Sequence, residues 1–135
     1  MATTTASITI ASSDIIPGMA MNYYKTATLN KAGGCVGLEK IMSGTVEYTS
    51  ISAQTLLDQS ALSVTADKAN KLYIKNLSTD TTEYATITIN SEDLGRLYAG
   101  DWLFIPWSAE DSSADVKITP SVATSMKFDY VLLHE

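Results

Sequence analysis

The chain has 135 residues and a mass of 14.5 kDa; 45% of its residues are hydrophobic and only 18% are charged. A chain of this length suits one compact domain, and it can bury enough surface to fold without a disulfide or a metal. We expect no membrane span, because no apolar run approaches about 18 residues. The first residues, Met1–Thr5, lack the basic and apolar regions of a signal peptide.

The chain is acidic, with 9 basic and 15 acidic residues and a formal net charge of −6. Lysine and arginine form no cluster in the sequence, so we expect neither nucleic acid nor an anionic membrane as a partner. A neutral or basic protein surface remains compatible with this charge.

Strands are predicted along most of the chain, from alternating apolar and polar residues and from abundant threonine. In chain order the expected strands are Ser7–Ile10, Met21–Leu29, Thr45–Ile51, Ala61–Thr65, Lys71–Lys75, Tyr84–Ile89, Trp102–Ile105, Val116–Ile118 and Met126–Leu133. The alternation is clearest in Lys71–Lys75 and Tyr84–Ile89, which we interpret as a hairpin joined by the polar segment 76–83. The continuous apolar run Trp102–Ile105 is typical of a strand buried on both faces.

Turn residues separate these strands, and helical signals are scarce. Pro17-Gly18 fits the centre of a type II turn, in which glycine takes a positive φ. Residues 52–59 are expected to form one or two helical turns, and residues 91–94 a single turn. The pattern therefore predicts an all-β protein, an antiparallel β-sandwich of about eight strands with little helix.

The first 18 residues are rich in serine, threonine and alanine, which favours an extended N-terminal arm before a sandwich formed by residues 19–135. The alternative is an ordinary first strand of the sandwich. If the segment is an arm, its spaced isoleucines are candidate partner-binding residues: Ile8, Ile10, Ile15 and Ile16.

The predicted core of the sandwich follows from the same alternation. It comprises Leu72, Ile74, Ile87, Ile89, Leu103, Phe104, Ile105, Phe128, Tyr130 and Leu132. Trp107 follows Pro106 at a strand end and is the ring most expected to be exposed, toward solvent, a glycan or a neighbouring subunit. It joins the isoleucines as a candidate partner-binding residue.

The sequence contains no recognisable catalytic or metal-binding set. Cys35 is the only cysteine, and it is expected to be a small, at least partly buried residue. His134 is the only histidine. A thiol nucleophile paired with a base and an ordinary zinc site are therefore both disfavoured. The acidic segment 108–115 lacks the ligand spacing of an EF-hand. We therefore predict no enzymatic activity, no cofactor, no metal and no small-molecule substrate.

The segment Leu97–Pro106, with Gly100-Asp101 before an apolar strand that ends in proline, resembles a segment of cupin jelly rolls. The resemblance implies a jelly-roll-like sandwich. It does not imply a cupin enzyme, because the histidines and glutamate that hold the cupin metal have no counterpart here.

The C-terminal half also resembles small virion structural proteins of tailed bacteriophages. The resemblance rests on Asn70–Asn76, Leu94–Pro106, Ile118–Ser121 and Phe128–Leu133, about 65 residues. These segments share with such proteins a strand ending in Lys-Asn, a Tyr-x-Gly-Asp turn, an apolar strand ending in proline and a closing aromatic–aliphatic strand.

This resemblance implies a head-decoration (cement) protein that binds the outer surface of a phage capsid. The partner would be the major capsid protein, self-association as a trimer would be favoured, and the protein would be made in the cytoplasm of the bacterial host. Tail, neck and head-fibre components belong to the same group and stay open as alternatives, as does a carbohydrate-binding, receptor-recognising module.

Overall fold

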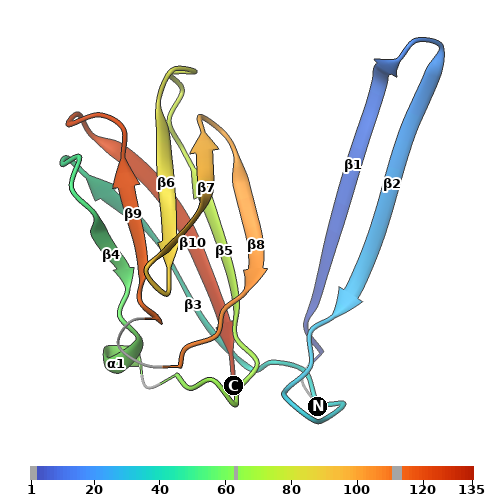
Figure 1. Cartoon of the computed structure of the whole chain (residues 1–135). Coiled ribbons are helices and arrows are strands. Elements are labelled where there is room, and N and C mark those ends of the chain that lie inside the picture. The colour runs from blue at the N-terminus through green and yellow to red at the C-terminus, as the bar shows by residue number, and fades with distance from the viewer. Residues whose placement is uncertain (1–2, 63, 111–113) are drawn as a thin grey trace. The chain divides into compact units, whose positions relative to one another are not determined.

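The computed structural model describes residues 3–62, 64–110 and 114–135, and it separates into two compact units, Met1–Glu39 and Lys40–Glu135. The strands are β1 (Thr5–Ile16), β2 (Met19–Thr28), β3 (Lys40–Tyr48), β4 (Gln54–Leu57), β5 (Lys71–Asn76), β6 (Tyr84–Ile89), β7 (Glu92–Tyr98), β8 (Trp102–Pro106), β9 (Val116–Pro120) and β10 (Met126–His134) (Figure 1). The only helix of the described residues, α1, spans Gln59–Leu62. The fold is therefore all-β, as expected, and no described helix has the length and apolar character needed to cross a membrane.

The N-terminal unit is built on one long antiparallel hairpin, β1–β2. Pro17-Gly18 forms its two-residue turn, and Gly18 has a φ of 78°, which agrees with the predicted type II turn. We expected residues 19–135 to form the sandwich, but residues 19–28 instead form β2, the partner of β1. The end of the hairpin is held by backbone hydrogen bonds from Leu29 N–H to the Thr4 carbonyl (2.8 Å) and from Leu38 N–H to the Leu29 carbonyl (2.9 Å).

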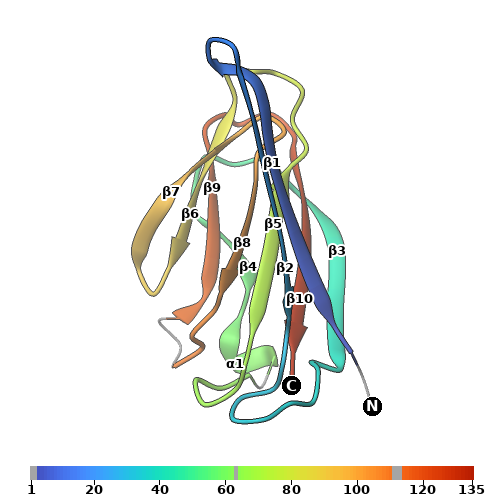
Figure 2. The same ribbon diagram turned by 90° about the vertical axis from the view of Figure 1, so that its right-hand side faces the viewer.

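The C-terminal unit is a sandwich of two four-stranded antiparallel sheets, ordered β3-β10-β5-β8 and β4-β9-β6-β7 (Figures 1 and 2). Counted from β3 as the first strand, these orders are 1-8-3-6 and 2-7-4-5. That arrangement is the eight-stranded jelly roll, in which consecutive strands mostly alternate between the sheets. The expected jelly-roll-like sandwich is thus confirmed.

The predicted hairpin between Lys71–Lys75 and Tyr84–Ile89 is wrong, although both strands exist. β5 pairs with β8 and β10, whereas β6 pairs with β7 and β9 in the opposite sheet. The polar segment 76–83 crosses from one sheet to the other. Alternation reveals that a strand has one buried face, but it does not reveal which strand lies beside it.

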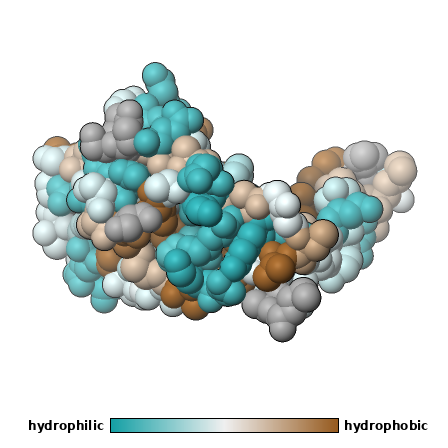
Figure 3. Space-filling model, turned by 90° about the horizontal axis from the view of Figure 1, so that it is seen from below, coloured by the Kyte–Doolittle hydropathy of each residue, from teal (hydrophilic) through white to brown (hydrophobic). Residues whose placement is uncertain are grey.

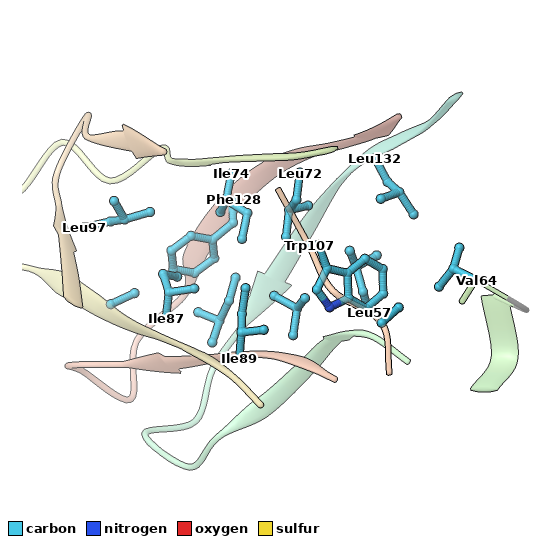
Figure 4. Close-up of a cluster of buried hydrophobic side chains, with 14 of the residues drawn as sticks. Leu57, Val64, Leu72, Ile74, Ile87, Ile89, Leu97, Trp107, Phe128 and Leu132 are labelled. Atoms are coloured by element: carbon cyan, nitrogen blue, oxygen red, sulfur yellow. The ribbon is translucent and has the colours of Figure 1, made fainter. Parts of the chain in front are cut away.

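The core lies between the two sheets, where side chains from both inner faces interlock (Figure 4). Burial alternates strictly in β5 and β6, as the sequence pattern predicts. Of the predicted core, the buried side chains are Leu72, Ile74, Ile87, Ile89, Phe128 and Leu132, and those partly buried against them are Leu103, Ile105 and Tyr130.

Phe104 is a correction to that core, because its side chain is 36% exposed. Strand β8 alternates between exposed and half-buried residues and is not buried on both faces. It is an edge strand of its sheet, so its outward side chains, Trp102 and Phe104, face away from the core.

The expected helical turns are mostly strands. Residues 54–57 form β4, and residues 92–98 form β7. The helix that does form, α1, begins after Asp58, whose carboxylate accepts hydrogen bonds from the backbone N–H groups of Ser60 (2.9 Å) and Ala61 (3.1 Å). It replaces the start of the strand expected at Ala61–Thr65, since aspartate at this position satisfies N–H groups that a helix start leaves unpaired.

Candidate interaction surface: an amphipathic hairpin

Among the residues that the structure describes, no three His, Cys, Asp or Glu side chains are placed to hold a metal ion. Cys35 is exposed, which corrects the expectation that it is at least partly buried. His134 is half-buried, and its Nδ1 atom lies 3.1 Å from the Glu135 carbonyl oxygen. Part of the acidic segment 108–115, residues 111–113, lies outside the described residues.

The hairpin β1–β2 has two chemically different faces. Residues directly opposite each other on paired antiparallel strands share a face. One face, here named the apolar face, comprises Ala6, Ile8, Ile10, Ser12, Met21, Tyr23, Lys25 and Ala27. The other, the hydroxyl face, comprises Thr5, Ser7, Thr9, Ala11, Asn22, Tyr24, Thr26 and Thr28.

The apolar face is open to solvent. Ile10 is 47% exposed, and its cross-strand partner Tyr23 is 48% exposed. Met21 next to them is 43% exposed. Hydrophobic residues are visible at the surface of this unit beside hydrophilic ones (Figure 3). Contiguous exposed apolar side chains of this kind mark interaction surfaces on soluble proteins.

The hydroxyl face satisfies its own polar groups. The Ser7 and Thr26 hydroxyls lie 2.8 Å apart across the strands, and the Thr26 hydroxyl donates to the Tyr24 phenol oxygen at 3.0 Å. These hydrogen bonds from Thr26 and Ser7 lower the pKa of Tyr24 below its ordinary value of 10.0. This face therefore suits contact with water, in contrast to the apolar face.

The hairpin is nearly free of charge. Between Thr5 and Thr28 only Asp14 and Lys25 are ionised, and the N-terminal unit as a whole is neutral. The net charge of −6 therefore resides in residues 40–135. A neutral surface can approach an acidic or a basic partner without Coulomb repulsion.

The isoleucines predicted to bind a partner all lie in β1, the first strand of this hairpin. Ile8 and Ile10 lie on the apolar face, and Ile15, beyond a bulge near the tip, is 72% exposed. The backbone of Ile16 pairs with that of Met19, and its side chain lies outside the described part of the structure. Met21 and Tyr23 were missed; extending the register from the Pro17-Gly18 turn would have placed them opposite the isoleucines.

Trp107 is a correction, because it is 2% exposed and not a surface ring. Its indole N–H donates to the Ala114 carbonyl oxygen at 2.8 Å, and the ring packs in the core of the sandwich (Figure 4). It is therefore removed from the candidate partner-binding residues.

Two exposed rings, Trp102 and Phe104, lie instead on the outer face of the sheet β3-β10-β5-β8. Trp102 on β8 is 47% exposed, and its ring centroid lies 6.1 Å from that of Tyr73 on β5. Phe104 lies directly across from Tyr73. Away from these rings, a shallow hollow near the segment 76–83 is lined by Leu77, Ser78, Thr79, Asp80, Glu83, Ser125 and Lys127.

No family model, curated protein or solved structure matches this chain.

Proposed function

We propose that the protein is a structural virion protein that decorates the outer surface of a phage capsid, with the hairpin β1–β2 as its anchor and the major capsid protein as its partner. The observation that carries the proposal is the uncovered apolar face of the hairpin, centred on Ile10 and Tyr23. The phage-like segments of the C-terminal half supply the class of partner.

The hairpin has physical reasons to bind a partner. An isolated two-stranded ribbon is marginally stable in water, and this one, at about 3.3 Å per residue, is roughly 40 Å long. Both strands are edges of their two-stranded sheet, so each has a row of backbone N–H and C=O groups free to pair. A capsid surface that covers the apolar face or adds a strand to either edge would stabilise the ribbon.

Attachment of this kind stabilises a shell by mass action, since the protein binds the assembled lattice in preference to free subunits. A modest gain at each site is multiplied over many copies. We propose a trimer as the attaching species, because three linked hairpins raise the effective concentration of each at a three-fold position of the lattice. The jelly-roll body agrees with this role, as viral capsid proteins also use this fold, although the fold alone does not define a function.

The hairpin supplies a matched pair of variants to test the proposal. In Ile10→Ser/Tyr23→Ser, a directly opposed pair on the apolar face is made polar. In Thr9→Ser/Tyr24→Ser, the adjacent opposed pair on the hydroxyl face is changed instead. Each protein is incubated with undecorated phage capsids, and the bound fraction is measured by co-sedimentation.

We expect the affinity of the apolar-face variant for capsids to fall at least about tenfold. A tenfold change in affinity requires only about 1.4 kcal/mol, less than the burial of one such side chain contributes. The hydroxyl-face variant should bind like the unmodified protein, and thermal melting of the sandwich should be unchanged in both. Undiminished binding of the apolar-face variant would reject the hairpin as the anchor. If the unmodified protein does not sediment with capsids, decoration is rejected in favour of a tail or neck role.

A further inference from the structure

We propose a second binding site, on the outer face of strands β5 and β8, that takes an anionic oligosaccharide. The site consists of Trp102, Phe104 and Tyr73 with two lysines, Lys71 and Lys75. It shares no residue with the hairpin, so this inference stands or falls separately from capsid attachment.

The rings form an open shelf. Trp102 and Tyr73 are inclined by only 32° to each other, and Phe104, 36% exposed, continues the shelf along β8. Another aromatic pair, the half-buried Tyr84 and the exposed Tyr98, lies on the outer face of the opposite sheet, but there the guanidinium of Arg96 sits 4.3 Å from the centre of the Tyr84 ring. That ring already has a cation as its partner, whereas the shelf on β5 and β8 leaves apolar ring surface for a ligand.

The two lysines flank the central ring on the same strand and the same face. Lys75 lies opposite Trp102 on one side and opposite Asp129 on the other. The Asp129 carboxylate, however, accepts the hydroxyl hydrogen of Thr45 at 2.5 Å. Among the described residues neither Lys71 nor Lys75 forms an ion pair; the ion pairs of the described chain join Lys31 to Glu39 and Lys68 to Glu135. Two unpaired cations beside the rings are notable in a unit whose net charge is −6.

Aromatic rings beside lysines indicate the chemistry of the ligand. A sugar ring carries an apolar C–H face that can lie on an aromatic ring, and its hydroxyl and carboxylate groups need hydrogen-bond donors at the edge. Lysine is depleted at the centre of protein–protein interfaces, where charges would be desolvated, so the interleaving of lysines with rings disfavours a dry protein contact. A nucleic acid would bring a long, continuous row of phosphates to an acidic domain, and two lysines could neutralise only a few of them, whereas a short acidic oligosaccharide carries only a few charges.

The spacing of the lysines sets a minimum ligand length. Lys71 and Lys75 are four residues apart on an extended strand, roughly 13 Å at about 3.3 Å per residue. A ligand that reaches both must be longer than a single sugar ring, so we infer an acidic oligosaccharide with more than one carboxylate.

The test uses the full chain with tetragalacturonate as the acidic probe and cellotetraose as its neutral counterpart of equal length. Affinity is measured by titration calorimetry. Tryptophan emission is measured in parallel, because of the two tryptophans Trp102 is exposed and Trp107 is buried, and contact at the shelf should change the emission of the exposed one. We expect tetragalacturonate to bind and to shift the emission, and cellotetraose to bind at least about tenfold more weakly.

The variants assign the binding to the shelf. Trp102→Ala and, separately, Lys71→Gln/Lys75→Gln should each weaken tetragalacturonate binding by about tenfold or more. The matched controls are Tyr98→Ala and Lys117→Gln on the opposite sheet, which should alter the affinity by less than about twofold.

Three results would overturn the inference. The first is that neither probe produces heat or an emission change at millimolar concentration. The second is that the control variants weaken binding as much as the shelf variants. The third is that Trp102→Ala dissociates a self-associated form in sedimentation velocity while no probe binds, which would make this face a contact between copies of the chain.

Discussion

Trp102 and Trp107 lie five positions apart in the sequence, yet the first ring is exposed and the second lies in the core. In β8 the odd-numbered residues Leu103 and Ile105 point toward the core, and Trp107 continues that phase beyond Pro106. The sequence contains this alternation, but the density of apolar residues from Trp102 to Ile105 conceals it. Hydrophobicity placed Phe104 in the core, although a strand on a sheet edge can expose large rings. Trp107 was expected at the surface because it follows Pro106 at a strand end, whereas its ring is buried.

The two tryptophans should therefore respond very differently to truncation. Trp107→Ala removes a buried ring and leaves the Ala114 carbonyl without its indole donor, so we expect the free energy of unfolding to fall by about 3–5 kcal/mol. Trp102→Ala should lower it by less than about 1 kcal/mol, because nearly half of the ring is already in water. Urea denaturation of both variants measures the difference, and equal losses would contradict the burial of Trp107.

At the level of the element, the hairpin β6–β7 was not predicted, because its turn has only a weak sequence signal. Its turn consists of Asn90 and Ser91, both with positive φ (54° and 63°). This is the geometry of a type I′ turn, for which asparagine followed by glycine is the strongest sequence signal. With serine in the second position the signal is weaker, and residues 91–94 instead suggested a single helical turn.

The turn also predicts a stabilising substitution. Ser91→Gly removes the Cβ that disfavours a positive φ, and we expect an increase of up to about 1 kcal/mol in the free energy of unfolding. Ser91→Val, which adds a branched Cβ at the same position, should have the opposite effect. Both are measured by the shift of the urea midpoint at constant slope; a Ser91→Gly protein less stable than the unmodified one would contradict the turn assignment.

For the molecule as a whole, the sequence predicted the fold class and the jelly-roll-like body, but not the pairing of the strands. Alternation in β5 and β6 established that each has one buried face, which is a local property. Their placement in opposite sheets depends on contacts with β8 and β9, far along the chain, and no local pattern encodes it. Similarly, β2 was expected to belong to the sandwich, because its sequence resembles that of any other alternating strand, whereas it pairs with β1.

The division of charge between the two units leads to a whole-molecule prediction. Since the hairpin is neutral and the acidic residues in excess lie beyond residue 39, capsid attachment through the hairpin should depend little on ionic strength. Raising the salt from about 50 mM to about 500 mM should change the co-sedimentation affinity by less than about threefold. Binding of tetragalacturonate at the two lysines should weaken clearly over the same range, and a steep salt dependence of capsid attachment would contradict a neutral anchor.

The pairing of β3 with β10, the first and last strands of the sandwich, has a consequence for synthesis of the chain. The jelly roll cannot close until its C-terminal strand has left the ribosome, and non-local strand pairing of this kind is slow. The hairpin needs only residues near the N-terminus and can form much earlier. Each nascent chain therefore exposes the apolar face of its hairpin before its body has folded, so the yield of soluble protein should fall where these faces associate between unfinished chains.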